Sequence, residues 1–196
     1  MNNMFYSSAH QDKFVYNILH KNNNGYFIDI GSNEPIFENN SYFLESVGWN
    51  GICIEMEKIN YSSRKCNYIN FNAVELCYPY LFLEYKVPKI IDYLSLDIDE
   101  NTTECLEKIP LDKYQFKVIT IEHDSYRFGT VPRDVQRKIL KNAGYHLLCQ
   151  DLTCPPLCDT QYFEDWWINP KFIDTNHIKY LECERCTTES VVNKFD

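Results

Sequence analysis

The sequence lacks the glycine-rich motifs with which many α/β proteins bind phosphate groups. The dinucleotide fingerprint G-x-G-x-x-G needs three glycines, for the turn, for approach of the pyrophosphate and for helix packing. Here only Gly31 follows the first apolar run, and Ser32, Asn33, Glu34 and Pro35 come next. A G-K-[ST] sequence is absent as well. These absences argue against a pyrophosphate cradle and leave a nicotinamide-dependent oxidoreductase as a weak alternative.

Basic residues are scarce relative to acidic ones. The chain has 19 Lys and Arg residues against 28 Asp and Glu residues, a formal net charge of −9. Proteins that bind nucleic acid usually carry a basic patch, so we expect no nucleic-acid partner. The charge favours a cationic or neutral ligand instead.

Long apolar runs are also missing. A helix needs roughly 20 apolar residues to cross a bilayer, and no run in this sequence approaches that length. The first residues, MNNMFYSSAHQDK, lack the basic-then-apolar layout of a secretory signal peptide. We therefore expect a soluble, cytoplasmic protein without a membrane partner, and the sequence predicts no particular oligomeric state.

The apolar content is nevertheless high enough for a packed core. Hydrophobic residues make up 44% of the 196 residues and aromatic residues 15%, which excludes a disordered or collagen-like chain. A chain of this length fits one domain. We assign residues 1–175 to that domain and residues 176–196 to a polar, cysteine-containing tail, loosely ordered from residue 187 onwards.

Apolar runs alternate with amphipathic stretches along the chain. The expected strands are Tyr26–Ile30, Gly51–Glu55, Tyr68–Val74, Ile90–Asp97, Phe116–Glu122, Tyr145–Gln150 and Glu164–Ile168. The expected helices are Gln11–His20, Tyr42–Val47, Lys58–Lys65, Thr102 to before Pro110, and Pro132–Ala143. Tyr78-Pro79-Tyr80 favours a loop, followed by a short strand or helical turn. The alternation indicates an α/β fold with a mostly parallel sheet between helices, and we expect Trp166 and Trp167 in its core.

The stretch Tyr26–Glu57 organises the rest of the chain. It predicts a strand, a tight turn, a helix and a second strand, with an acid at the end of each strand. Ligands of open α/β sheets bind outside such strand ends. Asp29 can pair with an ammonium group, Gly31 permits close approach, and Glu55 can accept both ribose hydroxyls. S-adenosylmethionine has these groups; the alternative is that Gly31 only makes a turn and Glu55 only ends a strand.

The motifs QDKFV, GYFIDIGSNEPIFENNSYFLESVGWNGICIE, IDYLSLDID, KVITIEHD, LKNAGYHLL and FEDWW follow one another along the chain. In this order the sequence resembles the FkbM family of S-adenosylmethionine-dependent methyltransferases, from about Gln11 to Pro170. The resemblance implies the class I, Rossmann-like methyltransferase fold, a mostly parallel seven-stranded sheet with an antiparallel last strand. It also implies O-methylation of a hydroxyl on a sugar, glycan or related metabolite, a small-molecule or glycan acceptor being the partner.

The resemblance further implies roles for individual residues. Those on the cofactor side are Asp29, Gly31, Ser32 and Asn33 in the cofactor loop, Glu55 at the ribose, and Asn72 and Ala73 at the adenine edge. Those facing the methyl group and the acceptor are Asp97 and Asp99, followed on the next strand by Glu122 and His123. Asp97 belongs to both groups.

The sequence departs from the family pattern in three places. Glu100 stands where the family often has glycine, Met56 where it usually has proline, and the segment 75–88 is shorter than the usual insertion. These departures concern the acceptor contacts and part of the adenine pocket. They motivate an alternative function, a catalytically degenerate protein with a methyltransferase fold that serves as a binding or interaction module.

Acids and one histidine at the later strand ends are the catalytic candidates. Methyl transfer to a hydroxyl requires alignment of donor and acceptor and removal of a proton, for which His123, Asp97 and Asp99 are placed. Mg²⁺ or Mn²⁺ bound by Asp97, Asp99 and Glu122 would offset the repulsion of these carboxylates. A donor sulfonium would do the same, and simple capping of strands and helices is the third possibility.

Nine cysteines, an odd number, are spread over the chain. Scattered cysteines in a chain without a signal peptide are usually reduced. Two close pairs, Cys154 with Cys158 and Cys183 with Cys186, flank His177. Four thiolates of this kind can form a tetrahedral Zn²⁺ site, and free thiols are the alternative.

Overall fold

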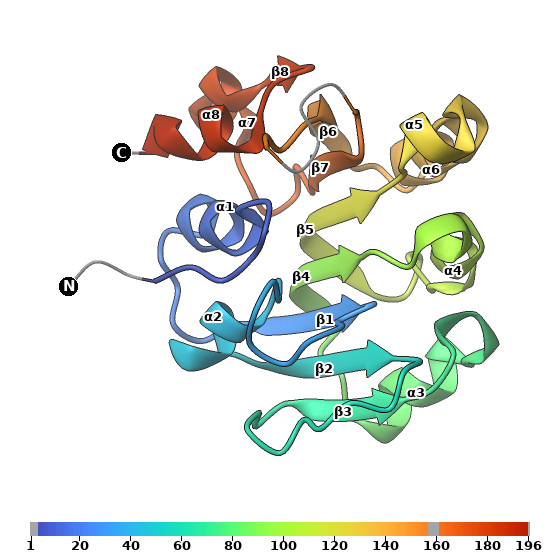
Figure 1. Ribbon diagram of the computed structural model, residues 1–196. Coiled ribbons are helices and arrows are strands. Elements are labelled where there is room, and N and C mark those ends of the chain that lie inside the picture. Colours follow the sequence, from blue (N-terminus) through green and yellow to red (C-terminus); the bar gives the residue numbers. More distant parts are fainter. Residues whose placement is uncertain (1–3, 157–160, 196) are drawn as a thin grey trace.

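The computed structural model describes residues 4–156 and 161–195, and one sheet forms their centre (Figure 1). Within these residues the sheet has eight strands in the order β3-β2-β1-β4-β5-β7-β6-β8. They are β1 (Tyr26–Ile30), β2 (Asn50–Glu55), β3 (Asn67–Asn70), β4 (Ile90–Leu96), β5 (Gln115–Glu122), β6 (His146–Leu152), β7 (Glu164–Ile168) and β8 (Cys183–Glu184).

Strand β7 is the antiparallel member of the sheet. It pairs antiparallel with both β5 and β6, whereas the pairs among β1 to β5 are all parallel. Seven strands with an antiparallel seventh confirm the predicted fold class. Strand β8 adds a short parallel partner to β6, and two residues are too few to show the periodicity that predicts a strand.

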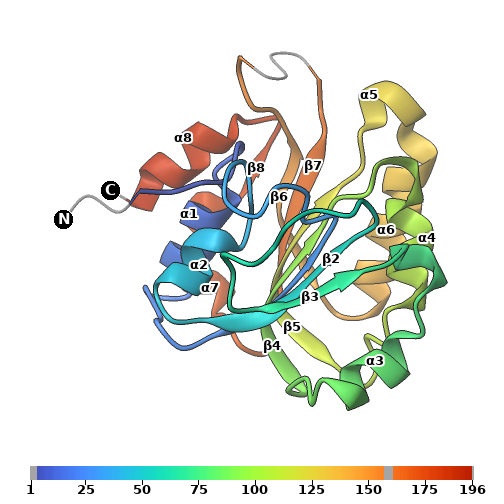
Figure 2. The same ribbon diagram turned by 60° about the horizontal axis from the view of Figure 1, so that its bottom comes forward.

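Helices cover both faces of the sheet (Figures 1 and 2). One face carries α1 (Gln11–Ile18), α2 (Tyr42–Ser46), α7 (Thr175–Ile178) and α8 (Thr188–Val192). The other carries α3 (Tyr78–Glu84), α4 (Thr102–Lys108), α5 (Ser125–Phe128) and α6 (Thr130–Asn142). Short 3-10 helices span Ala73–Glu75, Asp99–Asn101, Lys179–Leu181 and Asn193–Phe195.

The core consists of one apolar cluster on each face of the sheet. Successive side chains of a strand point to opposite faces, so the adjacent residues Trp166 and Trp167 of β7 join different clusters. Trp166 stacks on Phe14 of α1, with ring centroids 4.2 Å apart. Both tryptophans are fully buried, which confirms their predicted place in the core.

Three local predictions are wrong, the first being that the strand from Tyr68 reaches Val74: β3 ends at Asn70, and Ala73–Glu75 form a 3-10 helix. Lys58–Lys65 form no helix, because Arg64 turns inward and donates to the Pro35 carbonyl at 2.8 Å and pairs with Glu45 at 3.2 Å. The predicted loop at the start of α3 is helical. Pro79 lies in the first turn of that helix, where no backbone N–H is needed.

The tail folds onto the body of the protein. Strand β8 pairs with β6, and α8 packs against α1 with Val191 and Val192 buried. The prediction of loose order is therefore wrong for residues 187–195, because two adjacent valines and Leu181 supply buried surface that the polar composition conceals. The boundary at residue 175 stays a prediction.

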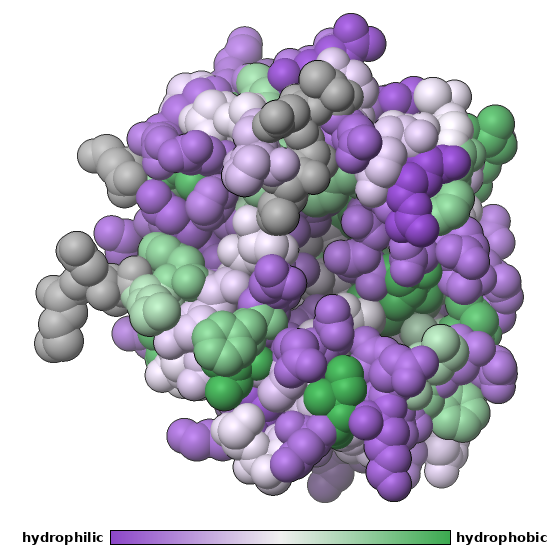
Figure 3. All heavy atoms as spheres, in the orientation of Figure 1, coloured by the Kyte–Doolittle hydropathy of each residue, from purple (hydrophilic) through white to green (hydrophobic). Residues whose placement is uncertain are grey.

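The outer surface is mainly polar. Within the described residues, no helix has both the length and the apolarity needed to cross a membrane. The face in Figure 3 is largely hydrophilic, and its hydrophobic residues form separate patches. Large apolar side chains that are exposed include Met56 and Phe71, which belong to the cavity described next.

Candidate active site

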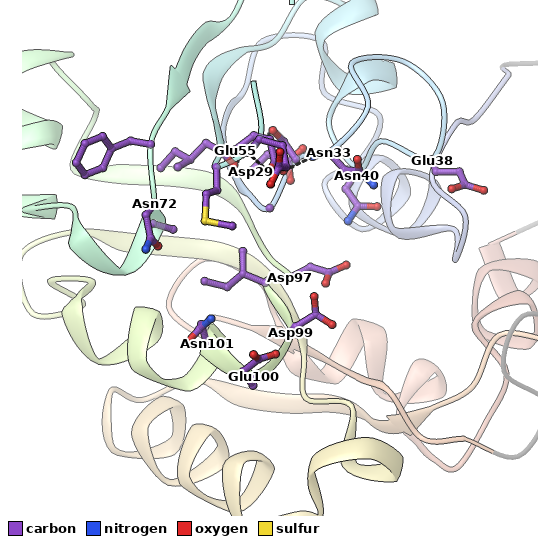
Figure 4. Close-up of a pocket in the computed structure, with 18 of the residues that line it drawn as sticks. Asp29, Asn33, Glu38, Asn40, Glu55, Asn72, Asp97, Asp99, Glu100 and Asn101 are labelled. Atoms are coloured by element: carbon purple, nitrogen blue, oxygen red, sulfur yellow. Dashed lines mark hydrogen bonds between the residues drawn. The ribbon is translucent and has the colours of Figure 1, made fainter. Parts of the chain in front are cut away.

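The chain reverses its path across the sheet between β1 and β4. From β1 it proceeds to β2 and β3 on one side and then returns to β4 on the other. Ligands of open α/β sheets bind outside the strand ends at such a switch point. A cavity of about 510 Å³ lies there, lined from β1, β2 and the segments that follow β1, β2, β3 and β4 (Figure 4).

The lining of this cavity is acidic. Among the described residues, no Lys, Arg or His lines it, and seven carboxylates do. They are Asp29, Glu38, Glu55, Glu57, Asp97, Asp99 and Glu100. A concave site lined by one sign of charge raises the local concentration of ligands of the opposite sign and repels phosphate.

Gly31 allows the loops after β1 and β4 to meet. It has φ +79°, and a Cβ at this position would lie 1.7 Å from the Asp97 carbonyl oxygen. Its N–H donates to the Ile54 carbonyl oxygen at 2.9 Å. The position therefore requires glycine, and the next two predicted cofactor residues, Ser32 and Asn33, line the same cavity.

The Glu55 carboxylate is oriented by the backbone at the end of β2. Its Oε2 accepts a hydrogen bond from the Asn33 N–H and its Oε1 one from the Glu57 N–H, each at 2.9 Å. An ionised carboxylate has about four acceptor positions. Two of them stay open for the two hydroxyls of a ribose, which fits the predicted role.

Asp29 lies at the floor of the cavity and is only 1% exposed. Its Oδ2 accepts from the Ser41 hydroxyl at 2.6 Å, and Arg64 donates to the same hydroxyl oxygen at 3.0 Å. Burial raises the pKa of Asp29 to about 6, although the Ser41 hydrogen bond and the Arg64 charge oppose it. Asp29 is therefore mainly ionised at neutral pH, as pairing with an ammonium group requires.

Apolar side chains line the end of the cavity where Asn72 and Ala73 lie. Met56 and Phe71 line it as well and are 62% and 46% exposed. Flat ligand rings bind against such walls. Neither Met56 nor Phe71 is among the predicted cofactor-binding residues, although Met56 directly follows Glu55 and Phe71 directly precedes Asn72.

Asp97 and Glu122 form a carboxyl–carboxylate pair at the ends of β4 and β5. Desolvation raises the pKa of both, and for Glu122 the hydrogen bond to Asp97 adds to the effect. Asp97 is exposed to the open cavity that it lines, whereas Glu122 does not line it. The hydrogen bond between them lowers the pKa of Asp97 and raises that of Glu122, so Glu122 is the member that holds the shared proton more tightly.

Asp99 lines the cavity but pairs with Arg127, and its side chain is 58% exposed. Asp97, Asp99 and Glu122, all in the described part of the chain, do not bring one oxygen each within 4.8 Å of one another. The predicted Mg²⁺ or Mn²⁺ site is thus not formed by these three residues. The guanidinium already supplies the cation that Asp99 would otherwise share with a metal.

His123 is buried behind the cavity and does not line it. Its Nδ1 accepts from the Ser125 N–H at 3.2 Å, and its Nε2 lies 3.6 Å from Asp165 Oδ1 and 3.8 Å from Asp151 Oδ1. These contacts turn both ring nitrogens away from the site. The predicted role of His123 as catalytic base is therefore not supported.

His123, Asp151 and Asp165 do bring one ligand atom each within 4.8 Å of one another. Arg137, however, contacts both carboxylates at 2.7–2.8 Å. Burial opposes the charge of Asp165, but hydrogen bonds from Arg137 and His123 outweigh it and lower the pKa. The cluster is a buried ion-pair network in which the guanidinium groups of Arg137 and Arg133 pair with the carboxylates.

The predicted zinc site includes Cys158, which lies outside the described residues. The other three members, Cys154, Cys183 and Cys186, do not gather their sulfurs within 4.8 Å of one another. Cys154 Sγ instead lies 3.4 Å from the Ser8 carbonyl oxygen. The three described thiols thus do not form the predicted site.

The chain was compared with known proteins. No protein-family model matches its sequence, and no curated protein matches it either. Its fold is similar to that of PH1948 from Pyrococcus horikoshii, which has been suggested to be an RNA methyltransferase, with TM-score 0.53 and 14% identity over 83% of this chain and 81% of the other. At this identity the likeness shows the fold alone, which is the class I, Rossmann-like methyltransferase fold.

Two further structures are more distant. P. horikoshii TYW2 in complex with MeSAdo has TM-score 0.49 and 14% identity over 86% of this chain and 65% of the other. A SAM-dependent methyltransferase from Archaeoglobus fulgidus has TM-score 0.43 and 16% identity over 96% of this chain and 85% of the other.

Proposed function

We propose that this protein is an S-adenosylmethionine-dependent O-methyltransferase whose acceptor is a hydroxyl of a sugar, glycan or related metabolite. The observation that carries the proposal is the acidic cavity at the β1/β4 switch point. There Asp29 is buried, Gly31 permits close approach, and Glu55 is oriented by backbone N–H groups. Binding of the donor's amino acid and ribose requires these three properties. The FkbM resemblance supports the same conclusion.

The residues of the cavity fit the proposed donor. Gly31 leaves room that a Cβ would fill, and the described lining carries no cation that would repel a sulfonium. Glu55 would accept the ribose hydroxyls, Asp29 would pair with the ammonium group, and Met56 and Phe71 would enclose the adenine. S-adenosylmethionine, when bound, would supply an electrophilic methyl group on a positively charged sulfur.

Asp97 is the residue placed to take the acceptor proton. It accepts the hydrogen bond of its pair with Glu122 and faces the cavity. Desolvation raises its pKa, which makes it a stronger base than a carboxylate with the ordinary aspartate pKa. Asp99, Glu100 and Asn101 on the same wall offer hydrogen-bond acceptors for neighbouring hydroxyls.

The same lining disfavours a polyanionic acceptor. RNA carries one phosphate per nucleotide, and proteins bind that charge with Lys and Arg. The seven carboxylates and the lack of basic side chains in the described lining oppose such a substrate. A neutral sugar hydroxyl meets no such repulsion.

A transfer assay with isotope-labelled donor and pools of neutral sugars and glycans tests this proposal. We expect label in an acceptor with the wild type, at least about 100-fold less with Asp97→Asn, and wild-type rates with Glu84→Ala, which removes an exposed carboxylate from α3. Donor binding without transfer to any pool would instead favour the degenerate binding module. Equal rates with Asp97→Asn would remove Asp97 from the chemistry.

A further inference from the structure

A second groove, of about 600 Å³, opens at the opposite edge of the sheet from β3. Its lining includes Lys141 from α6, His146 from β6, and Glu182 and Cys183 at β8. The candidate active site lies at β1 and β4, so this groove belongs to a different part of the molecule. The proposed methyl transfer does not use it.

Two thiols are placed in register beside this groove. Cys183 of β8 pairs in register with Cys149 of β6, and Cys186 follows three residues further along the chain. Residues paired across adjacent parallel strands have Cα atoms about 5 Å apart, within the range of roughly 4.4–6.8 Å that a disulfide needs. Cys149 is fully buried, whereas Cys183 is half-buried and lines the groove.

We propose that Cys183 is a redox-active thiol that reacts with a hydroperoxide entering from this groove, and that Cys149 is its resolving thiol. The groove gives the oxidant access to one sulfur, and the strand register places the second sulfur where a disulfide can form. This arrangement stands independently of the methyltransferase proposal.

The charge state of the three thiols supports these roles. The largest influence on the pKa of Cys183 is its interaction with the Cys149 thiol, which lowers it. Cys186 and the charge of Lys194 lower it further. Together they outweigh burial, and the pKa of Cys183 falls to about 7. The hydrogen bond to Cys183 and burial raise the pKa of Cys149. Cys183 is thus the thiol of the group whose pKa is lowered, and it has the largest fraction of thiolate, the form that attacks.

The chemistry proceeds in two balanced steps. The Cys183 thiolate attacks one peroxide oxygen, the O–O bond breaks, and hydroxide leaves a sulfenic acid on Cys183. The Cys149 sulfur then attacks the Cys183 sulfur, the S–O bond breaks, and the hydroxyl leaves with the Cys149 proton as water. Overall, two thiols are oxidised, one hydrogen peroxide is reduced, and two waters form.

The pair Cys53 and Cys66 provides an internal comparison. Their sulfurs are 3.5 Å apart, so proximity alone would favour a disulfide there too. Cys53 is fully buried, however, and the hydrogen bond to Cys53 together with burial raises the pKa of Cys66. We therefore expect this second pair to react far more slowly.

The disulfide would fasten the C-terminal segment to the sheet. It would close a loop between β6 and β8 and so tie the short strand β8, with α8 behind it, to the body of the protein. A disulfide that closes the loop from Cys149 to Cys183 stabilises the folded state, because it restricts the unfolded chain. We expect the oxidised protein to melt roughly 5–10 °C higher than the reduced protein.

The test uses the reduced 196-residue protein, treated with stoichiometric hydrogen peroxide near neutral pH and mapped by peptide mass spectrometry. We expect a Cys149–Cys183 disulfide as the first product, with Cys53 and Cys66 still reduced. With Cys149→Ala, the sulfenic acid on Cys183 has no resolving thiol and should accumulate, so that a 1,3-diketone probe labels it. Cys186→Ser should still form the disulfide, and Cys183→Ser should not.

The disulfide map of the wild-type protein decides the outcome even if a variant at the buried residue Cys149 folds poorly. A first disulfide between Cys183 and Cys186 would overturn Cys149 as the resolving thiol. Oxidation of Cys53 and Cys66 as fast as Cys183, or no reaction at Cys183, would overturn the proposal as a whole. Metal analysis of the untreated protein completes the test, because one tightly bound zinc released on oxidation would make these thiols metal ligands instead.

Discussion

Gly31 permits a contact that no other residue type allows. Its positive φ and the 1.7 Å separation between a built Cβ and the Asp97 carbonyl oxygen are both prohibitive for a side chain. Gly31→Ala should lower the free energy of unfolding by about 3 kcal/mol or more, through backbone strain and displacement of the loop after β4. Urea unfolding measures the change.

Gly144 supplies the matched control for this substitution. It also has positive φ, +87°, but nothing lies within 4 Å of a built Cβ. Gly144→Ala should therefore cost only about 1 kcal/mol. Equal losses for the two variants would mean that the close approach at Gly31 contributes nothing.

Glu164 should make the stability of the protein depend on pH. It is 3% exposed, and burial, only partly offset by the hydrogen bond from Trp166, raises its pKa from 4.5 to about 8. Between these values the folded state binds more protons than the unfolded state, so stability falls as the pH rises through this window. The fall attributable to this group is on the order of a few kcal/mol.

Urea unfolding at about pH 5 and about pH 8.5 measures this dependence. The wild type should lose stability between the two values, and Glu164→Gln, which cannot ionise, should lose much less. If both proteins show the same pH dependence, the buried carboxylate is not its source.

At the scale of single residues, the sequence predicted which residues line the cavity better than it predicted what each residue does there. Asp29, Gly31, Glu55 and Asp97 stand at strand ends, and the alternation of strands brings strand ends together. The direction of the His123 side chain depends instead on the Ser125 N–H and on acids from β6 and β7. Such contacts between distant segments leave no local pattern.

At the scale of elements, Arg64 joins its own segment, residues 58–65, to the loop after β1 and to α2. Its guanidinium donates to Pro35 and Asn39 in the loop after β1 and to Ser41 before α2, and it pairs with Glu45 of α2. It is 8% exposed. A buried cation with this many partners holds the loop in one conformation, and it keeps the segment 58–65 from forming a helix.

Removal of this cation should be costly. Arg64→Leu leaves Glu45 buried without its partner, and we expect a loss of about 3–5 kcal/mol in the free energy of unfolding. Arg64→Lys keeps the charge but not the forked geometry and should lose less. Urea unfolding of both variants tests this, and a loss below about 1 kcal/mol for Arg64→Leu would contradict the account.

The elements themselves were predictable to different degrees. Strands β1, β2, β4, β5 and β7 were predicted within one residue at each end, because buried parallel strands are continuous apolar runs bounded by turns. The helical start of α3 was missed because Pro79 suits a first helical turn as well as a loop. Strand β8 depends on pairing with β6, which the sequence does not show.

At the scale of the whole molecule, the strand order creates the site and the charge distribution selects its ligands. The β1/β4 switch point places the cavity, and the excess of acidic residues is concentrated in its lining. The sequence predicted the fold class from alternating elements and the net charge from composition. It could not predict that the tail packs on α1, because Val191 and Val192, which are buried there, lie in an otherwise polar segment.

The central claim, that this cavity binds the methyl donor, is tested most directly by calorimetric titration with S-adenosylhomocysteine, the demethylated product. We expect the wild type and Glu84→Ala to bind one equivalent with equal affinity. Glu55→Ala should bind at least about tenfold more weakly, because it loses hydrogen bonds from two hydroxyls to a charged group. No binding by the wild type, or unchanged binding by Glu55→Ala, would contradict the account.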